Sequence, residues 1–180
     1  NVSSSTNLPA VSILESAGVT ESRPRTVTIL VSESDSFKVS IADYLSRTLS
    51  TDGLTVTVRA LPWSDYLAAL QGGNFDIYLA EVRLTADWNS TSLVGTGGAL
   101  NSGRYADESC NTLLAAFLAN PTAQTANALC RYLEQNAPIA PIAFKTASVL
   151  TPEGLIDGLT PTVSSPFYGI EGWTVHFDKR

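Results

Sequence analysis

Three charged residues and a tryptophan follow the apolar run that begins at Phe75, and their types suit ligand binding. Glu81 and Arg83 are two positions apart, so on a strand they point to the same face and could pair with each other or with a zwitterionic ligand. Asp87 precedes Trp88, which sets a carboxylate beside an aromatic wall and suits an amine or a sugar. The alternatives are a structural surface ion pair and a turn Asp beside a rim aromatic.

The sequence offers little support for a catalytic site. The only histidine, His176, falls in a predicted terminal strand, and no Gly-x-Ser-x-Gly elbow or phosphate-binding glycine motif occurs. Glu81 and Asp87 could serve as a glycosidase pair, but two acids at a strand end are the simpler interpretation. One His without clustered Cys makes a transition-metal site improbable. We therefore predict no catalytic residue, no metal and no cofactor.

The elements that must position these side chains follow a βαβ pattern. The stretch Phe75–Arg83 is predicted to be a buried strand whose apolar run stops at charged residues. A strand that is apolar on both faces is typical of a parallel sheet covered by helices, and ligands meet such sheets beyond the carboxyl ends of the strands. The other predicted strands here are 26–31 and 54–60, the second at a sheet edge, and the predicted helices are 7–18, 37–50 and 63–73.

The second half of the chain changes character. A glycine-rich loop is expected near 95–103, then two antiparallel helices, 107–118 and 121–136, with Asn120-Pro121 supplying the cap between them. Further on we expect an extended segment at 138–144, a short strand at 146–150, a turn at 155–159, a loop at 161–166 and a final strand at 173–177. These elements predict an α/β fold: a three-layer-like lobe with a mixed, mainly parallel sheet flanked by helices.

Cys110 and Cys130 are each ten residues from Asn120, so on an antiparallel helical hairpin they would lie level. A disulfide across the hairpin is geometrically plausible. Two separate buried thiols are an equally good interpretation, because cysteine is often simply buried.

Composition limits the partners. The 11 basic and 17 acidic residues give a net charge of -6, which argues against nucleic acid or an anionic membrane as the main partner. No stretch approaches the about 20 apolar residues of a transmembrane helix. The 180 residues include no methionine, even at position 1. We therefore expect an excised or processed piece, with residues 1–7 as a linker remnant and 8–180 as a single lobe.

Several segments, in this order and spacing, resemble one family. They are AxxILExAG (from Ala10), WSDYLAALQGGNFDIYLAEV (from Trp63), ADWN, RYADESCNTLLAAF and LEQNAPIAPIAF. Together they are similar to the C-terminal lobe of the extracellular solute-binding proteins of peptide and nickel ABC transporters, often called family 5. The resemblance covers nearly the whole chain, although the Gly-Trp that usually precedes the ADWN position is replaced here by Glu81-Val82-Arg83-Leu84.

The resemblance implies a role for particular residues. In peptide-binding members an Asp in an aromatic-flanked loop takes the ligand's α-amino group, and Asp87, before Trp88, matches that position. Asn101 and Tyr105 match a segment that shapes the cleft wall. With Glu81 and Arg83 these complete the predicted ligand-binding set.

The resemblance also implies a setting for the chain. It would be one lobe of a two-lobed, monomeric, non-catalytic, extracytoplasmic binding protein, a periplasmic protein or a surface lipoprotein. That protein would take an oligopeptide or another small molecule and deliver it to the membrane permease of an ABC transporter. The alternative is the effector-sensing domain of a cytosolic transcription regulator, which shares the βαβ organisation.

Overall fold

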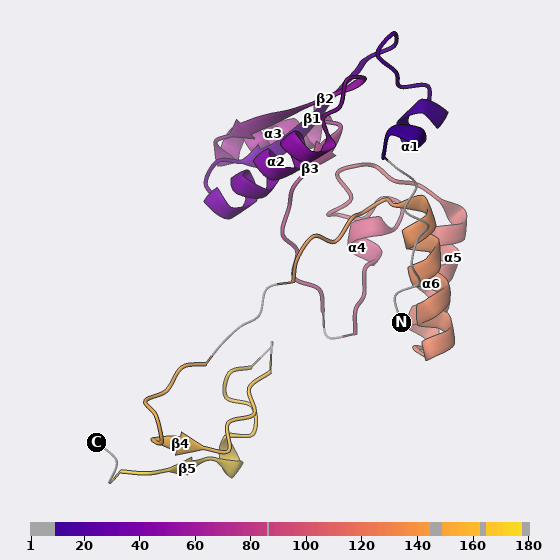
Figure 1. Cartoon of the computed structure of the whole chain (residues 1–180). Coiled ribbons are helices and arrows are strands. Elements are labelled where there is room, and N and C mark those ends of the chain that lie inside the picture. Colours follow the sequence, from indigo (N-terminus) through magenta and orange to yellow (C-terminus); the bar gives the residue numbers. More distant parts are fainter. Residues whose placement is uncertain (1–9, 86, 145–148, 163–164, 178–180) are drawn as a thin grey trace. The chain divides into compact units, whose positions relative to one another are not determined.

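The computed structural model describes residues 10–85, 87–144, 149–162 and 165–177. Contacts divide the chain into two compact units (Figure 1). The first comprises the residues up to Arg83 together with Gly97–Ala106, and the second comprises Leu84–Thr96 and the residues from Asp107 on. Each is described by itself. The expected helix start at Asn7 and most of the expected strand at 146–150 lie outside the described residues.

The first unit alternates helices and strands, as predicted. Its elements are α1 (Ala10–Ser16), β1 (Arg25–Ser32), α2 (Ser36–Leu49), β2 (Leu54–Leu61), α3 (Trp63–Gly72) and β3 (Ile77–Tyr78). β1 lies between β2 and β3 and pairs in parallel with both. The prediction of a parallel sheet flanked by helices, with β2 at an edge, is therefore confirmed.

The core of this unit lies on both faces of β1. Ile29, Leu30 and Val31 are 0% exposed, and alternation along the strand sends them to opposite faces. Ile29 and Val31 pack with Ala42 of α2, whereas Leu30 packs with Tyr66 of α3. The strand buried on both faces is thus β1.

β3 is shorter and more exposed than the strand predicted in Phe75–Arg83. It pairs with β1 only at Ile77 and Tyr78, and the Ile77 side chain is 39% exposed. The physical reason is its position: β3 lies at an edge of the described sheet, where only one side of the strand meets a neighbour. The prediction that this strand is buried on both faces was wrong.

Ser46 of α2 and Ser50, the C-cap of this helix, bond to the outer edge of β2. The Ser46 hydroxyl donates to the carbonyl oxygen of Val56 at 2.6 Å, and the Val56 N–H donates to Ser50 Oγ at 3.0 Å. These bonds satisfy backbone groups that an edge strand would otherwise present to another chain.

The second unit begins with short helix α4 (Thr91–Val94) and continues with α5 (Glu108–Ala119) and α6 (Ala123–Asn136). α5 and α6 pack side by side as the predicted hairpin (Figure 1). The N-cap of α6 is Thr122, not Asn120 as expected. Thr122 Oγ1 accepts from the N–H of Thr125, and Thr125 Oγ1 accepts from the N–H of Thr122, so the reciprocal box starts the helix after Pro121.

The two cysteines are free thiols, so the possible disulfide between Cys110 and Cys130 is not formed. Cys110 is 0% exposed, but Cys130 is exposed. The buried position on α6 is Leu129, and Cys130 is one residue further on, about 100° around the helix. The alternative of a buried thiol therefore holds for Cys110 alone.

The C-terminal part contains β4 (Ile156–Asp157), the 3₁₀ turn η1 (Ile170–Gly172) and β5 (Thr174–Val175). β4 pairs antiparallel with β5, so the expected turn at 155–159 holds a short strand, and β5 falls inside the strand predicted at 173–177. The described part of 138–150 forms no strand. No side chain in 149–162 or 165–177 is buried. Nowhere in the described chain is a helix both long and apolar enough to cross a membrane.

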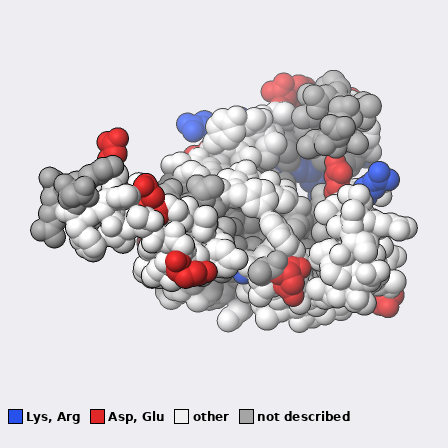
Figure 2. Space-filling model, turned by 90° about the horizontal axis from the view of Figure 1, so that it is seen from below, with Lys and Arg blue, Asp and Glu red and all other residues white. Residues whose placement is uncertain are grey.

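Figure 2 shows the charges on one face of the molecule. The described Lys and Arg side chains stand singly there among acidic and uncharged residues.

Candidate functional site

The backbone leading to Glu81 is held against the sheet. The N–H of Leu79 donates to the carbonyl oxygen of Leu30 at 2.9 Å, and the carbonyl oxygen of Leu79 accepts from the Tyr66 hydroxyl at 2.9 Å. Burial raises the pKa of Tyr66 to about 12, so this hydroxyl keeps its proton at neutral pH. Glu81 follows two residues later, beyond the carboxyl end of β3, which is where the sequence predicted ligand contacts.

The structure gives Glu81 a partner that sequence reasoning missed. Lys38 Nζ lies 3.3 Å from Glu81 Oε2 and 2.7 Å from Asp35 Oδ2. Asp35 is also the N-cap of α2, because its side chain accepts from the N–H of Lys38 at 3.1 Å. An N-cap Asp with Lys three residues later, directly after a strand, is the signal that could have placed this ammonium group at the carboxyl end of β1.

Two opposing effects act on the pKa of Lys38. Partial burial, the largest single effect, lowers it. The hydrogen bonds to Asp35 and Glu81 and the negative charges of these two residues together raise it by more, so the pKa of Lys38 lies above its ordinary value. Lys38 is therefore a permanent cation between the two carboxylates. The predicted pairing of Glu81 with Arg83 or with a zwitterionic ligand stays a prediction.

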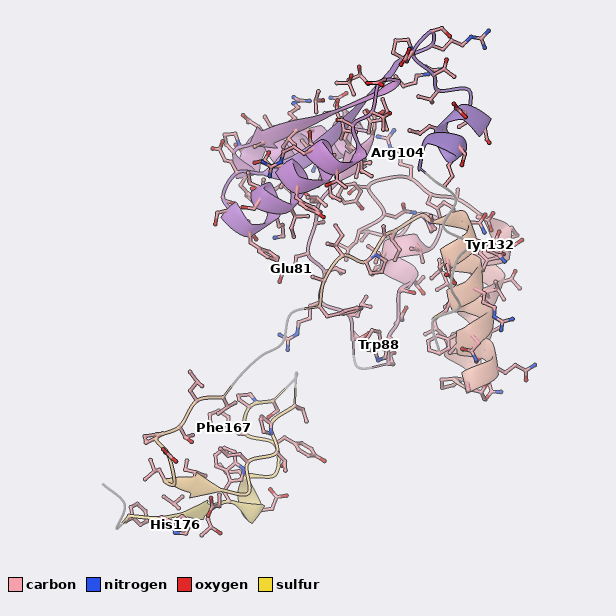
Figure 3. The ribbon with its side chains drawn as sticks, viewed as in Figure 1. Glu81, Trp88, Arg104, Tyr132, Phe167 and His176 are labelled. Atoms are coloured by element: carbon pink, nitrogen blue, oxygen red, sulfur yellow. The ribbon has the colours of Figure 1, made fainter. Side chains whose placement is uncertain are left out.

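Asp87 and Trp88 lie in a tight turn of the second unit. The N–H of Trp88 donates to the carbonyl oxygen of Thr85 at 2.9 Å, and Trp88 has a positive φ of 57° and is 60% exposed. Figure 3 labels Trp88 in this loop. The Thr85 hydroxyl and the N–H of Asn89 both donate to Asp87 Oδ1. These two bonds, the Thr85 hydroxyl first, lower the pKa of Asp87. The result is an exposed carboxylate beside an exposed indole.

Asn101 and Tyr105 close a loop of the first unit. Asn101 Oδ1 accepts from the N–H of Tyr105 at 2.9 Å, and Asn101 Nδ2 donates to the carbonyl oxygen of Tyr105 at 2.7 Å. Arg104 has a positive φ of 54° and donates from Nη2 to the carbonyl oxygen of Gln71, at the end of α3. The Asn101 amide therefore shapes this loop, and its contact with a ligand stays a prediction.

The six predicted ligand-binding residues fall in both units. Four belong to the first unit and two to the second; these are Glu81, Arg83, Asn101 and Tyr105, then Asp87 and Trp88. Their assembly into one cleft stays a prediction.

A separate hollow in the first unit lies away from these residues. It is lined by residues of α1 and by residues just before the strands, including Glu15, Thr20 and Asp52. Because it sits at the amino ends of β1 and β2, it is not the predicted site, which lies where the strands end.

His176 has a partner in the C-terminal hairpin (Figure 3). The Nε2 atom of the His176 ring lies 2.8 Å from Asp157 Oδ2. The backbone N–H of His176 donates to the carbonyl oxygen of Leu155. No Ser or Cys of the described residues bonds to this ring. The described residues also contain no group of three His, Cys, Asp or Glu that could hold a metal ion.

Asp107 organises the start of the helical hairpin. Its Oδ1 accepts from the N–H of Cys110 at 2.7 Å and from the Tyr132 hydroxyl at 2.8 Å (Figure 3). These bonds lower the pKa of Asp107, and the same carboxylate raises the pKa of Tyr132. The contact ties α6 to the N-cap of α5 and has a structural role.

No model of a known protein family matches the sequence, and no curated protein matches it either. Solved structures do match. The Escherichia coli murein tripeptide binding protein MppA is 26% identical, with a TM-score of 0.59 over 73% of this chain and 27% of that protein. The chain thus shares its fold with part of a peptide-binding protein.

Two further structures extend the match. Haemophilus influenzae OppA, solved in complex with the peptide RPPGFSPFR, is 17% identical, with a TM-score of 0.56 over 71% of this chain and 26% of OppA. Staphylococcus aureus NikA, solved with Ni(L-His)2, is 14% identical, with a TM-score of 0.61 over 71% of this chain and 29% of NikA. At these identities the likeness is one of fold.

The chain shares its fold with part of peptide and nickel solute-binding proteins. This confirms the resemblance to peptide and nickel solute-binding proteins that the sequence predicted. The chain spans about a quarter of the length of the first matched proteins, 26–27%.

Proposed function

We propose that this chain is the ligand-binding lobe of an ABC-transporter solute-binding protein, that it is not catalytic, and that its ligand is an oligopeptide. The observation that carries the proposal is the shared fold with the tripeptide-binding MppA at 26% identity. The proposed lobe covers residues 8–180 of a larger two-lobed protein. No finding favours the effector-sensing alternative.

The proposed contact for the ligand's α-amino group is Asp87. In the described structure the hydrogen bonds to this carboxylate reach Oδ1, from Thr85 and Asn89, and both donors are neutral. Its negative charge is therefore available to an ammonium group, and the exposed Trp88 ring beside it can pack against the ligand. The lowered pKa of Asp87 keeps the carboxylate charged at neutral pH.

The proposed setting follows from the same relatives. MppA is described as periplasmic, and we place this protein outside the cytoplasm as well, as a monomer in the periplasm or as a surface lipoprotein. It would hand its ligand to the membrane permease of the transporter.

Calorimetry of the natural protein with alanine peptides of two to five residues, and with Ni(L-His)2, tests the proposal. We expect peptide binding that weakens about 10- to 100-fold in Asp87→Ala, because a hydrogen-bonded charge contact is lost. The matched control is Asp43→Ala, on the exposed side of α2, which should bind as the wild type does. If the protein bound Ni(L-His)2 and no peptide, the proposed ligand would be a metal complex instead of a peptide. If it bound neither, the proposed role as a ligand-binding lobe would be overturned.

A further inference from the structure

The loop 97–106 belongs to the first unit, although the chain on both sides of it belongs to the second. Hydrogen bonds attach this loop to elements of the first unit. The Tyr78 hydroxyl, at the end of β3, donates to the carbonyl oxygen of Leu100 at 3.3 Å. Arg104 Nη2 donates to the carbonyl oxygen of Gln71 at 3.0 Å (Figure 3). The loop is thus fixed to both β3 and α3.

Arg104 holds a backbone conformation that its residue type disfavours. Its φ is 54°, in the left-handed region, where the Cβ atom of an L-residue crowds the backbone. Glycine adopts this region without that cost, and a glycine, Gly103, stands one position earlier in the chain. Strained residues persist only where their surroundings hold them, and they gather at binding sites. The strain at Arg104 therefore points to a function of its side chain.

The guanidinium group of Arg104 binds the C-terminal end of α3. Gln71 is the last residue but one of this helix, so its carbonyl oxygen is one of those that a helix leaves without an intrahelical partner. These oxygens form the negative end of the helix dipole, which favours a cation there. A Cβ atom at Gly73, the C-cap, would lie 3.8 Å from the guanidinium carbon, so the group packs against this last turn.

We propose that Arg104 is a positioning residue of the ligand site, which holds the predicted contacts Asn101 and Tyr105 in their binding conformation before a ligand arrives. The inference deepens the proposed function and rests on it. The Asn101 side chain bonds to both the N–H and the carbonyl oxygen of Tyr105, so these two residues form one rigid piece of the loop. Arg104 joins that piece to α3. The cost of ordering the loop is then met on folding and not on binding.

Calorimetry of the natural protein with alanine peptides of two to five residues tests the inference in three variants. Arg104→Gly removes the side chain and the strain, Arg104→Ala removes the side chain and keeps the strain, and Arg104→Lys keeps a cation that can reach Gln71. We expect the affinity to fall about 5- to 10-fold in Arg104→Gly and in Arg104→Ala, because the loop must then be ordered on binding. Arg104→Lys should recover most of the affinity.

Urea unfolding of the same variants separates positioning from a purely structural role. If Arg104 only stabilised the fold, affinity would follow the free energy of unfolding. We expect Arg104→Gly to be more stable than Arg104→Ala, because the strain is gone, and yet to bind peptide no better. Amide hydrogen exchange gives a local measurement: the N–H of Tyr105 should exchange faster in ligand-free Arg104→Gly than in the wild type, and saturating peptide should reduce the difference.

A second attachment keeps the test decisive if the Arg104 variants do not fold. Tyr78→Phe removes the hydroxyl that holds Leu100 and should weaken peptide binding about threefold, since a neutral hydrogen bond is lost. Its control is Tyr44→Phe, at a side chain that is 63% exposed. The control for Arg104 is Arg47→Met, because Arg47 also places a cation in the last turn of a helix, α2. Both controls should bind peptide as the wild type does.

The outcomes separate the two proposals. Wild-type affinity in Arg104→Gly, or an affinity that follows the free energy of unfolding through the three variants, would overturn the inference and leave peptide binding intact. If the Arg104 variants do not fold, wild-type affinity in Tyr78→Phe would overturn it. A wild type that binds no alanine peptide would overturn the proposed function, and the inference would fall with it.

Discussion

Glu81 and Asp87 are both exposed carboxylates predicted to touch a ligand, yet the chain holds them in different ways. Glu81 follows a backbone bonded to a buried strand and contacts a cation, Lys38, from a capped helix. Asp87 lies in a turn and takes its hydrogen bonds from residues two positions away on either side. The orientation of Glu81 therefore depends on tertiary packing, whereas that of Asp87 depends on local sequence.

Because Glu81 and Asp87 are held in different ways, substitutions near them should affect stability and ligand binding differently. A contact that is set by the sheet is placed accurately, but any loss of core packing disturbs it. A contact that is set by a turn survives core substitutions and adapts to its ligand. Substitutions in the core and in the turn should therefore have effects of different size and kind.

The largest expected effect comes from the core below Glu81. Leu30→Ala removes a side chain that is 0% exposed and packed against Tyr66, so the free energy of unfolding should fall by about 2–5 kcal/mol. Urea unfolding followed by circular dichroism measures it. The matched control is Leu67→Ala on α3, where the side chain is 38% exposed and the loss should stay below about 1 kcal/mol. Equal losses in the two variants would contradict a core centred on β1.

A smaller effect is expected from the hydroxyl that anchors Leu79. Tyr66→Phe leaves the carbonyl oxygen of Leu79 without its buried donor, which should cost about 1–3 kcal/mol of unfolding free energy. Tyr44→Phe, with a side chain that is 63% exposed, is the control and should unfold as the wild type does. If Tyr44→Phe lowered the free energy of unfolding as much as Tyr66→Phe does, the hydrogen bond from Tyr66 to Leu79 would not explain the loss.

The same hydroxyl should make stability depend on alkaline pH. The pKa of Tyr66 is raised from 10.0 to about 12, so the folded state holds this proton more tightly than the unfolded state. The contribution is fully present below pH 10 and is lost as the pH rises through about 12. Between pH 10 and about 12, the free energy of unfolding should fall more in the wild type than in Tyr66→Phe.

The predictable part of the fold was the part with a clear local pattern. β1, α2, β2 and α3 follow the periodicities of strand and helix, and Gly73, with a φ of 70°, ends α3 where the sequence predicted the end of this helix. Apolar content alone did not reveal which strand is central, because the runs in β1 and β3 look alike. Their burial differs only through the neighbours that the sheet supplies.

The candidate site was less predictable because its contacts join distant residues. The spacing of Glu81 and Arg83 suggested a pair, which stays a prediction. The structure adds a contact that no spacing could suggest, between Glu81 and Lys38, which is 43 positions away. The helical hairpin was predicted, but the register of its buried face was not: Leu129 is buried where Cys130 was expected. An error of one position in the buried face of a helix changes the fold little, but it decides whether the Cys130 thiol is buried or exposed.

The smallest expected effect lies in the Asp87 turn and concerns pH. The Thr85 hydroxyl is the main cause of the lowered pKa of Asp87, so Thr85→Val should bring this pKa back toward 3.8. Because the folded pKa is depressed, the stabilising charge is present above pH 3.8 and is lost as the pH falls through the folded value; in the variant that loss should begin at higher pH. Carboxyl NMR titration measures the shift, with Thr112→Val on α5 as a control that leaves Asp87 unchanged. An unchanged titration in Thr85→Val would mean that the turn does not hold Asp87 locally, and the contrast with Glu81 would fail.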